Sequence, residues 1–322
     1  NGTGQDITTL DFQPDWLWIK RRDSVGSHRI QDSIRGTTNY LQSDKTDAEA
    51  SGGDVDAFLS NGFSLSGGAT AYNVSGGTYV GWSWLGGGTA SSNTDGSITS
   101  SVSANTTSGF SIVSFVGNAT GGVTVGHGLG VAPKVVIIKG RDSALGWRSY
   151  FAPLGATKYL ELDSTAGEAS NTNFMNDTAP TNQVFYLGNG TTPNKNGENY
   201  IAYCFAEKKG FSKFGSYTGN GNADGTFVYT GFSPSFVMLK RTNTTGSWTM
   251  YDNKRHTYNP NGEYLLANSS GASVDFDNVD FLSNGFKLRD ASFNNGSGDT
   301  IIYMCFAENP FTTSTGIPTT AR

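Results

Sequence analysis

The sequence predicts an all-β protein made of tandem β-sandwich units of the lectin-like or jelly-roll type, with little helix. Composition is the first reason, because 43 glycines and 12% aromatic residues accompany only 15% charged residues, whereas globular proteins average about 25%. Pattern is the second: alternating apolar and polar residues at 158–163 and 226–232 are bounded by clusters of Gly, Asn, Ser and Asp, which is typical of short strands joined by turns. The 3.6-residue apolar period of an amphipathic helix is missing.

Three segments of the chain share landmarks in the same order. Each contains a proline, a run of large apolar residues and a basic end: "FQPDWLWIKRRD" at 12–23, "GVAPKVVIIKGRD" at 130–142 and "FSPSFVMLKRTN" at 232–243. Each closes on a second common strand: "GTYVGWSWLGG" at 77–87, "ENYIAYCFAEK" at 198–208 and "DTIIYMCFAEN" at 299–309. Internal similarity at a period of roughly 100 residues predicts three copies of one β-sandwich unit.

We place these units at residues 1–88, 109–209 and 210–322, with a Gly/Ser/Thr-rich linker at 89–108. The linker's "SITSSVS" is alternatively an edge strand of the second unit. The second and third units open alike, with "GFSIVSFVGN" at 109–118 and "GFSKFGSYTG" at 210–219. The first unit has no such strand, because Asn1 and Gly2 align with Asn220 and Gly221, beyond it. We therefore expect residue 1 to lie inside a unit.

The apolar runs "VVIIK" and "FVMLK" are expected to be strands covered on both faces. In the first unit, Trp16, Trp18, Trp82 and Trp84 form two alternating pairs, so each strand directs both of its indoles to one face. The matching positions in the other units are apolar, which favours core packing over a binding surface.

A glycine-rich loop, "VGHGLGVAPK" at 125–134, holds one of only three histidines. It lacks the Ser or Thr and the following helix of a phosphate-binding loop, so we interpret it as a tight turn with positive φ and His127 as a hydrogen-bonding turn residue. His28 and His256 are expected on the surface. Cys204 and Cys305 occupy matching positions in two different units, where small residues pack, so no disulfide is expected.

The candidate metal ligands are weak ones. Asp275, Asp277 and Asp280 lie close together in "DFDNVD" and carry oxygen atoms that Ca²⁺ prefers, but we favour a solvated acidic turn ahead of the next strand. We therefore expect no cofactor, with Ca²⁺ as the open alternative. The pattern of paired carboxylates that sandwich glycosidases use is missing, so we expect no enzyme activity.

Aromatic residues provide the candidate ligand-binding site. Trp147 and Trp248 follow Gly/Ser turns, so we expect them to be partly exposed and able to stack on sugar rings, with Arg148 beside them. The basic ends of the three apolar strands, among them Lys20, Lys139 and Lys240, are expected to end those strands in solvent.

Charge and hydropathy exclude other partners. A net charge of -5 gives no basic surface for nucleic acid, and no apolar run reaches the length of a membrane span.

The stretch from Asp95 onward, including "SVSANTTSGFSIVSFVGNATGGVTVGHGLGVAPKVVIIKGRD" and "SKFGSYTGNGNADGTFVYTGFSPSFVMLKRT", resembles a repeat domain of uncharacterised function from structural proteins of marine bacteriophages, in tail or fibre proteins. The resemblance implies a component of the virion surface that attaches to host-cell polysaccharide, contacts other virion proteins and forms a homo-oligomer, with a trimer favoured. Two alternatives stay open: a decoration protein of the head or tail that binds no receptor, and a polysaccharide depolymerase.

Overall fold

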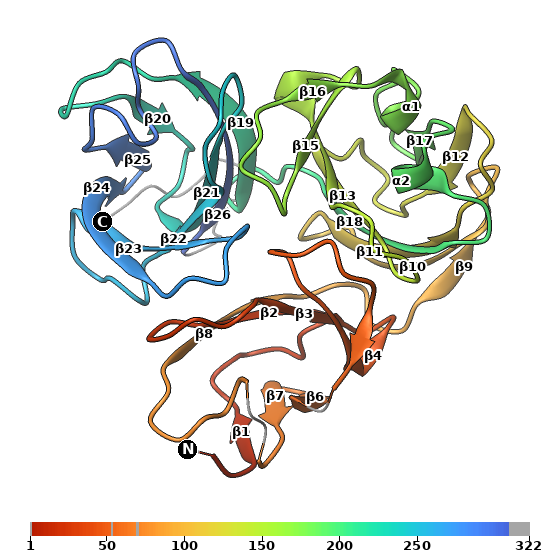
Figure 1. Cartoon of the computed structure of the whole chain (residues 1–322), viewed down its shortest axis with the longest axis horizontal. Coiled ribbons are helices and arrows are strands. Elements are labelled where there is room, and N and C mark those ends of the chain that lie inside the picture. Colours follow the sequence, from red (N-terminus) through yellow and green to blue (C-terminus); the bar gives the residue numbers. More distant parts are fainter. Residues whose placement is uncertain (1, 53, 69–70, 309–322) are drawn as a thin grey trace.

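The computed structural model describes residues 2–52, 54–68 and 71–308, which form three lobes around a common centre (Figure 1). The first lobe comprises residues up to 88, the second residues 89–209 and the third residues 210–308. Nearly all regular structure is antiparallel β-sheet, so the all-β prediction is confirmed. The helical elements are η1 (Ala152–Leu154), α1 (Thr172–Met175) and α2 (Thr191–Asn194). No helix in the described ranges is long and apolar enough to span a bilayer.

The first lobe has one five-stranded sheet and one three-stranded sheet. The larger sheet has the order β5-β4-β3-β2-β8 and the smaller one the order β1-β7-β6. Their strands are β1 (Gln5–Ile7), β2 (Trp16–Arg21), β3 (Arg29–Asp32), β4 (Gly36–Leu41), β5 (Ala50–Ser51), β6 (Val55–Leu59), β7 (Gly62–Leu65) and β8 (Tyr79–Trp84).

The second lobe has an eight-stranded sheet, β16-β15-β14-β13-β18-β11-β10-β9, and a two-stranded sheet, β12-β17. The segment 89–108, expected to be a linker, contributes two of these strands. The alternative prediction, that "SITSSVS" forms an edge strand of the second unit, agrees with this position. The strands are β9 (Ser91–Asn93), β10 (Ser100–Asn105), β11 (Phe110–Val116), β12 (Val123–Gly126), β13 (Val135–Gly140), β14 (Arg148–Phe151), β15 (Lys158–Glu161), β16 (Ala169–Ser170), β17 (Val184–Leu187) and β18 (Asn199–Phe205).

The third lobe is one curled eight-stranded sheet, β19-β26-β21-β22-β23-β24-β25-β20. Its strands are β19 (Ser212–Thr218), β20 (Phe227–Tyr229), β21 (Pro234–Arg241), β22 (Thr249–Asp252), β23 (Asn261–Leu266), β24 (Val274–Leu282), β25 (Gly285–Leu288) and β26 (Thr300–Ala307). The runs β4-β3-β2-β8, β15-β14-β13-β18 and β23-β22-β21-β26 have the same connectivity, so β2, β13 and β21 occupy corresponding places in the three lobes.

These three strands are covered on both faces, as their uniformly apolar sequences predict. In β13, Val135 and Ile137 face a central core, whereas Val136 and Ile138 face a core inside the second lobe. The central core takes residues from all three lobes, and each lobe has a further cluster of its own. A strand with apolar residues at every position is needed because successive side chains point to opposite faces, and both faces are buried.

The three lobes meet at one set of aromatic rings. Trp84 on β8, Phe205 on β18 and Phe306 on β26 lie in mutual contact, with ring centroids 5.5–6.4 Å apart. Trp16, Trp18 and Trp82 are buried in the same central core. Core packing of the tryptophan pairs is therefore confirmed, although Trp84 keeps part of its surface exposed.

Candidate functional site

The three lysines at the basic strand ends hold neighbouring lobes together. Lys20, Lys139 and Lys240 are fully buried, so the expectation that they end in solvent is wrong. Each ammonium group donates to a main-chain carbonyl of an adjacent lobe: Lys20 to Gly271 at 2.7 Å, Lys139 to Thr46 at 2.9 Å and Lys240 to Thr165 at 3.0 Å. Burial lowers the pKa of each lysine to about 8. Lys20 thus links the first lobe to the third, Lys139 links the second lobe to the first, and Lys240 links the third lobe to the second. The three bonds together connect the lobes in a closed cycle.

Trp147 and Trp248, expected to be sugar-stacking surfaces, belong to the same cycle. Both are buried, so the prediction of exposed rings is wrong. The Trp147 indole N–H donates to Gln42 O of the first lobe, and the Trp248 indole N–H to Glu161 O of the second, both at 2.9 Å. A turn before a tryptophan predicts exposure only where nothing covers the turn, and here an adjacent lobe does.

His28 completes this set and is not the surface residue that was expected. It follows Lys20 by the same interval that separates Trp147 from Lys139 and Trp248 from Lys240. Its Nδ1 accepts from the Trp18 indole at 2.7 Å, so its Nε2 carries the proton and donates to Leu266 O at 2.9 Å. Desolvation, assisted by the charge of Lys20, lowers the pKa of His28 to about 3. His28 is thus a neutral connector between the first and third lobes.

The glycine-rich loop is a turn. Gly128 and Gly130 have φ of 70° and 71°, which confirms the positive-φ interpretation. His127 is buried, accepts from the Leu129 N–H through Nδ1 and bonds Thr181 O through Nε2 at 3.1 Å. Cys204 and Cys305 are both free and buried, as the packing interpretation predicts.

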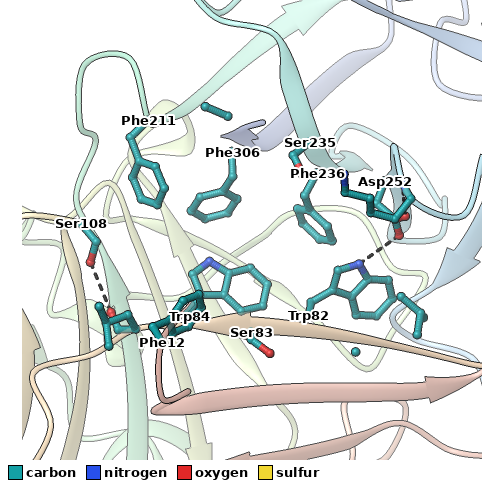
Figure 2. Close-up of a pocket in the computed structure, with 15 residues that line it drawn as sticks. Phe12, Trp82, Ser83, Trp84, Ser108, Phe211, Ser235, Phe236, Asp252 and Phe306 are labelled. Atoms are coloured by element: carbon teal, nitrogen blue, oxygen red, sulfur yellow. Dashed lines mark hydrogen bonds between the residues drawn. The ribbon is translucent and has the colours of Figure 1, made fainter. Parts of the chain in front are cut away.

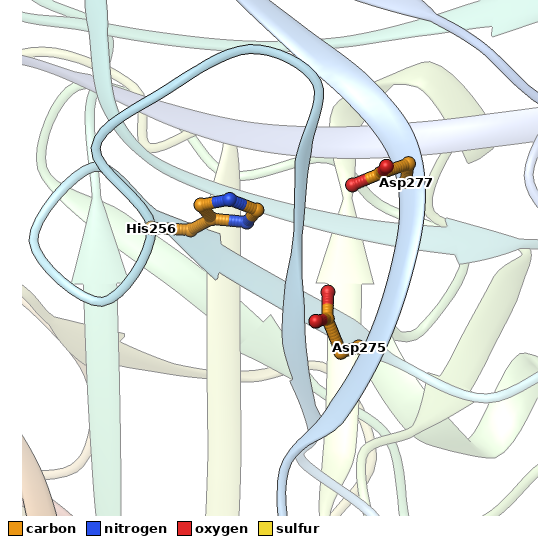
Figure 3. Close-up of side chains that lie close together, drawn as sticks. All are labelled: His256, Asp275 and Asp277. Carbon is orange, nitrogen blue, oxygen red and sulfur yellow. The ribbon is translucent and has the colours of Figure 1, made fainter.

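The aspartates proposed as calcium ligands separate into two places. Figure 3 shows Asp275 and Asp277 near His256, and the ligand atoms of these three residues all lie within 4.8 Å of one another. Asp280 is instead buried and paired with Arg289 at 2.6 Å. The prediction that it joins Asp275 and Asp277 in one metal site is therefore wrong. The third potential ligand beside Asp275 and Asp277 is His256, which is partly buried. One imidazole with two carboxylates suits a transition metal better than Ca²⁺, which prefers six or more oxygens.

Arg148 is the predicted site residue that reaches a surface pocket. Its guanidinium lies 3.9 Å from the ring centroid of Tyr159, and Nη1 lies 2.8 Å from Glu161 Oε1. These contacts fix the side chain along one wall of a cavity of about 400 Å³. The other lining residues come from α1 and the residue before it, from α2 and from the loop between β17 and α2: Asn171, Asn173, Phe174, Asn189, Gly190, Thr191, Thr192 and Pro193.

The short segment "GNG" at 188–190 shapes this pocket. The Gly188 N–H donates to Phe174 O at 2.9 Å and the Gly190 N–H to Asn173 O at 3.1 Å. A Cβ at position 188 would lie 2.3 Å from the main chain of Asn173, so only glycine permits this approach. Asn173 and Asn189 are exposed at the pocket. The paired glycines were the sequence signal for this close approach, whereas the neighbouring asparagines gave no signal of their own.

The fold and this site define a three-lobed, all-β protein with a polar surface pocket and a core shared by its lobes. The chain belongs to the family described as domain of unknown function (DUF7483), which matches residues 1–310. No curated protein and no solved structure matches the chain.

Proposed function

We propose that the protein is a non-enzymatic adhesin of a bacteriophage surface, in a tail fibre or a related structure, that binds host-cell polysaccharide at the Arg148 pocket. The observation that carries the binding proposal is the pocket lining. Three asparagines, Asn171, Asn173 and Asn189, stand beside Thr191 and Thr192, and amides and hydroxyls both donate to and accept from sugar hydroxyls. The assignment to a virion rests on the resemblance described under Sequence analysis.

The chemistry of the pocket favours a particular class of glycan. The planar donors of the Arg148 guanidinium suit a carboxylate. The ion pair with Glu161 involves Nη1, at 2.8 Å, and leaves 17% of the Arg148 side chain and 30% of the Glu161 side chain exposed. A polysaccharide that contains uronic acid or another carboxylated sugar is therefore expected to bind more tightly than a neutral one.

A glycan array with the purified protein tests this proposal, with the double variant N173A/N189A as the decisive comparison. Both side chains line the pocket and are exposed, so their loss removes ligand contacts with little effect on stability. T244A, at an exposed position in the third lobe, is the matched control. Binding that N173A/N189A weakens at least about tenfold and T244A leaves unchanged supports the pocket; equal binding by all three proteins, or none by any, rejects it.

An architectural role in the particle is the second candidate, and a different observation favours it. Within the described part of the chain, β8 is the last strand of the first lobe's larger sheet, and it lies beside an apolar cavity. Uncovered apolar surface next to an open sheet edge is typical of a protein that is built into an assembly. The position of the protein in an intact particle distinguishes the two roles, because a decoration protein lies flat on the shell with the Arg148 pocket covered.

A further inference from the structure

The outer edge of β8 differs from the corresponding edges in the other two lobes. In the second lobe, β11 pairs with β18 along its whole length, from Phe110 opposite Phe205 to Val116 opposite Asn199. In the third lobe, β19 pairs in the same way with β26. In the first lobe, β8 pairs with β2 and is the last strand of its sheet within the described residues. Among the residues that the structure describes, no strand covers this sheet edge as β11 and β19 cover its two counterparts.

The hydrogen-bonding groups of this edge can be assigned from the register. The Arg22 N–H donates to Thr78 O, and hydrogen-bonded pairs alternate along an antiparallel ladder. The pair of Trp18 and Trp82 is then hydrogen-bonded, whereas Gly81 and Ser83 have main-chain groups that point away from β2. Their counterparts in β18, Ala202 and Cys204, face β11.

Side chains show the same difference. Every residue of β18 except the first is buried, whereas in β8 only Trp82 is buried and Gly81 is exposed. A cavity of about 500 Å³ lies along this edge. Figure 2 shows Trp82 and Trp84 on one side of it and Phe211, Phe236 and Phe306 of the third lobe on the other.

The other two lobes show what fills the corresponding space. Phe110 and Ile112 of β11 are buried in the central core opposite Phe205 and Tyr203. Phe214 of β19 is buried there opposite Met304. In the described residues, β8 has no such neighbour opposite Trp82 and Trp84, so the cavity has the position and the apolar lining of a missing strand.

We infer that β8 accepts an added antiparallel strand from polypeptide outside these 322 residues. This strand carries large apolar side chains at alternate positions, opposite Trp82 and Trp84, as β11 does. The β11 and β19 strands of a second copy cannot supply it, because they are already paired. Residues 309–322 contain only Phe311 and Ile317 as large apolar residues, and these are not alternate positions. Strand addition of this kind takes affinity from main-chain bonds and specificity from alternate side chains.

A synthetic peptide with the sequence of residues 109–118 tests this inference on the 322-residue protein. We expect it to bind with a Kd of about 10–100 μM and to slow hydrogen exchange at Gly81 and Ser83 at least about tenfold. The matched control peptide carries F110S and I112S, which keep its main-chain groups and remove the apolar side chains. Equal binding of the two peptides, protection elsewhere than on β8, or no binding would overturn the inference.

Two protein variants separate strand pairing from simple occupation of the cavity. G81P removes an N–H from the outer edge, where proline is tolerated, and is expected to lower the affinity at least about tenfold. G81A keeps that N–H, and its Cβ would lie 3.6 Å from Leu17, so it is expected to bind normally. Equal affinities of G81P and G81A contradict strand pairing. Tighter binding to a protein that ends at Glu308 than to the full chain would make residues 309–322 the occupant and also overturn the inference.

Discussion

Acidification should weaken the contact between the first and third lobes through one residue, His28. The fully buried imidazole accepts from Trp18 and donates to Leu266 O, so a second ring proton would meet a donor instead of an acceptor. Burial, the largest cause, and the charges of Lys20 and Arg255 lower its pKa to about 3, against two main-chain bonds that raise it. The folded protein therefore resists protonation of this residue.

The sign and size of the effect follow from linkage. The unfolded chain binds the proton with a pKa of 6.5 and the folded chain with a pKa of about 3. The stability from this depressed pKa is complete above pH 6.5 and is lost as the pH falls toward 3. Between pH 7.5 and pH 4.5 the loss from His28 is about 3 kcal/mol, at 1.36 kcal/mol for each pH unit below 6.5.

A double variant separates the contribution of His28 to the pH dependence of stability from the contribution of the carboxylates. W18I/H28W gives the first lobe the side chains that the second lobe has at Ile137 and Trp147, which pack in the same central core. Urea unfolding at pH 7.5 and pH 4.5 measures the free energy of unfolding of both proteins. We expect the wild type to lose about 3 kcal/mol more than the variant. Equal losses, or an NMR titration of His28 near pH 6 in the folded protein, would refute the reasoning.

Three further outcomes are expected. K139M leaves the carbonyls of Thr46 and Leu145 without their donor and should lower the free energy of unfolding by about 2–4 kcal/mol, measured in urea; a change near zero would mean that water replaces the ammonium group. D252A removes the acceptor of the Trp82 indole and the partner of Arg255, so it should lower the free energy of unfolding by about 3–5 kcal/mol. D224A, at an exposed ion pair, should lower it much less because solvent screens the pair, and similar losses for both variants would contradict this ranking. Millimolar Ca²⁺ should raise the Tm by less than about 1 °C, because Asp280 is held by Arg289 and three ligands do not form a calcium cage; a rise of several degrees that D275N abolishes would contradict this.

Sequence periodicity predicts which strands form, because alternation depends only on the strand's own residues. The tryptophans at 16, 18 and 82 and the apolar run at 135–138 are buried for the reason that their pattern implies. The errors at the buried lysines, Trp147, Trp248 and His28 concern residues whose partners lie in another lobe. Lys139 and Trp147 look like a solvated strand end and an exposed ring, and only the first lobe's loop, through Thr46 and Gln42, makes them interior. No property of the residues next to them indicates that contact.

The Arg148 pocket was also predicted only in part. Arg148 was predicted as a binding residue beside Trp147, and it does reach the surface, because neighbours on a strand point to opposite faces. Trp147 faces the central core, whereas Arg148 faces the Asn- and Thr-lined pocket. The structure therefore separates the two residues that were expected to form one site, and of the two only Arg148 lines the pocket.

The shared core also constrains where a partner can act on this protein. The rings of Trp84, Phe205 and Phe306 touch at the centre, and the cavity beside β8 is lined by Trp84 and Phe306 themselves. A strand that enters the cavity would therefore bury apolar surface of the first and third lobes together, which stabilises their contact as well as the sheet. The Arg148 pocket lies in the second lobe and shares no lining residue with this cavity. We therefore expect a strand bound at β8 to leave the lining of the Arg148 pocket unchanged, because the two sites share no residue.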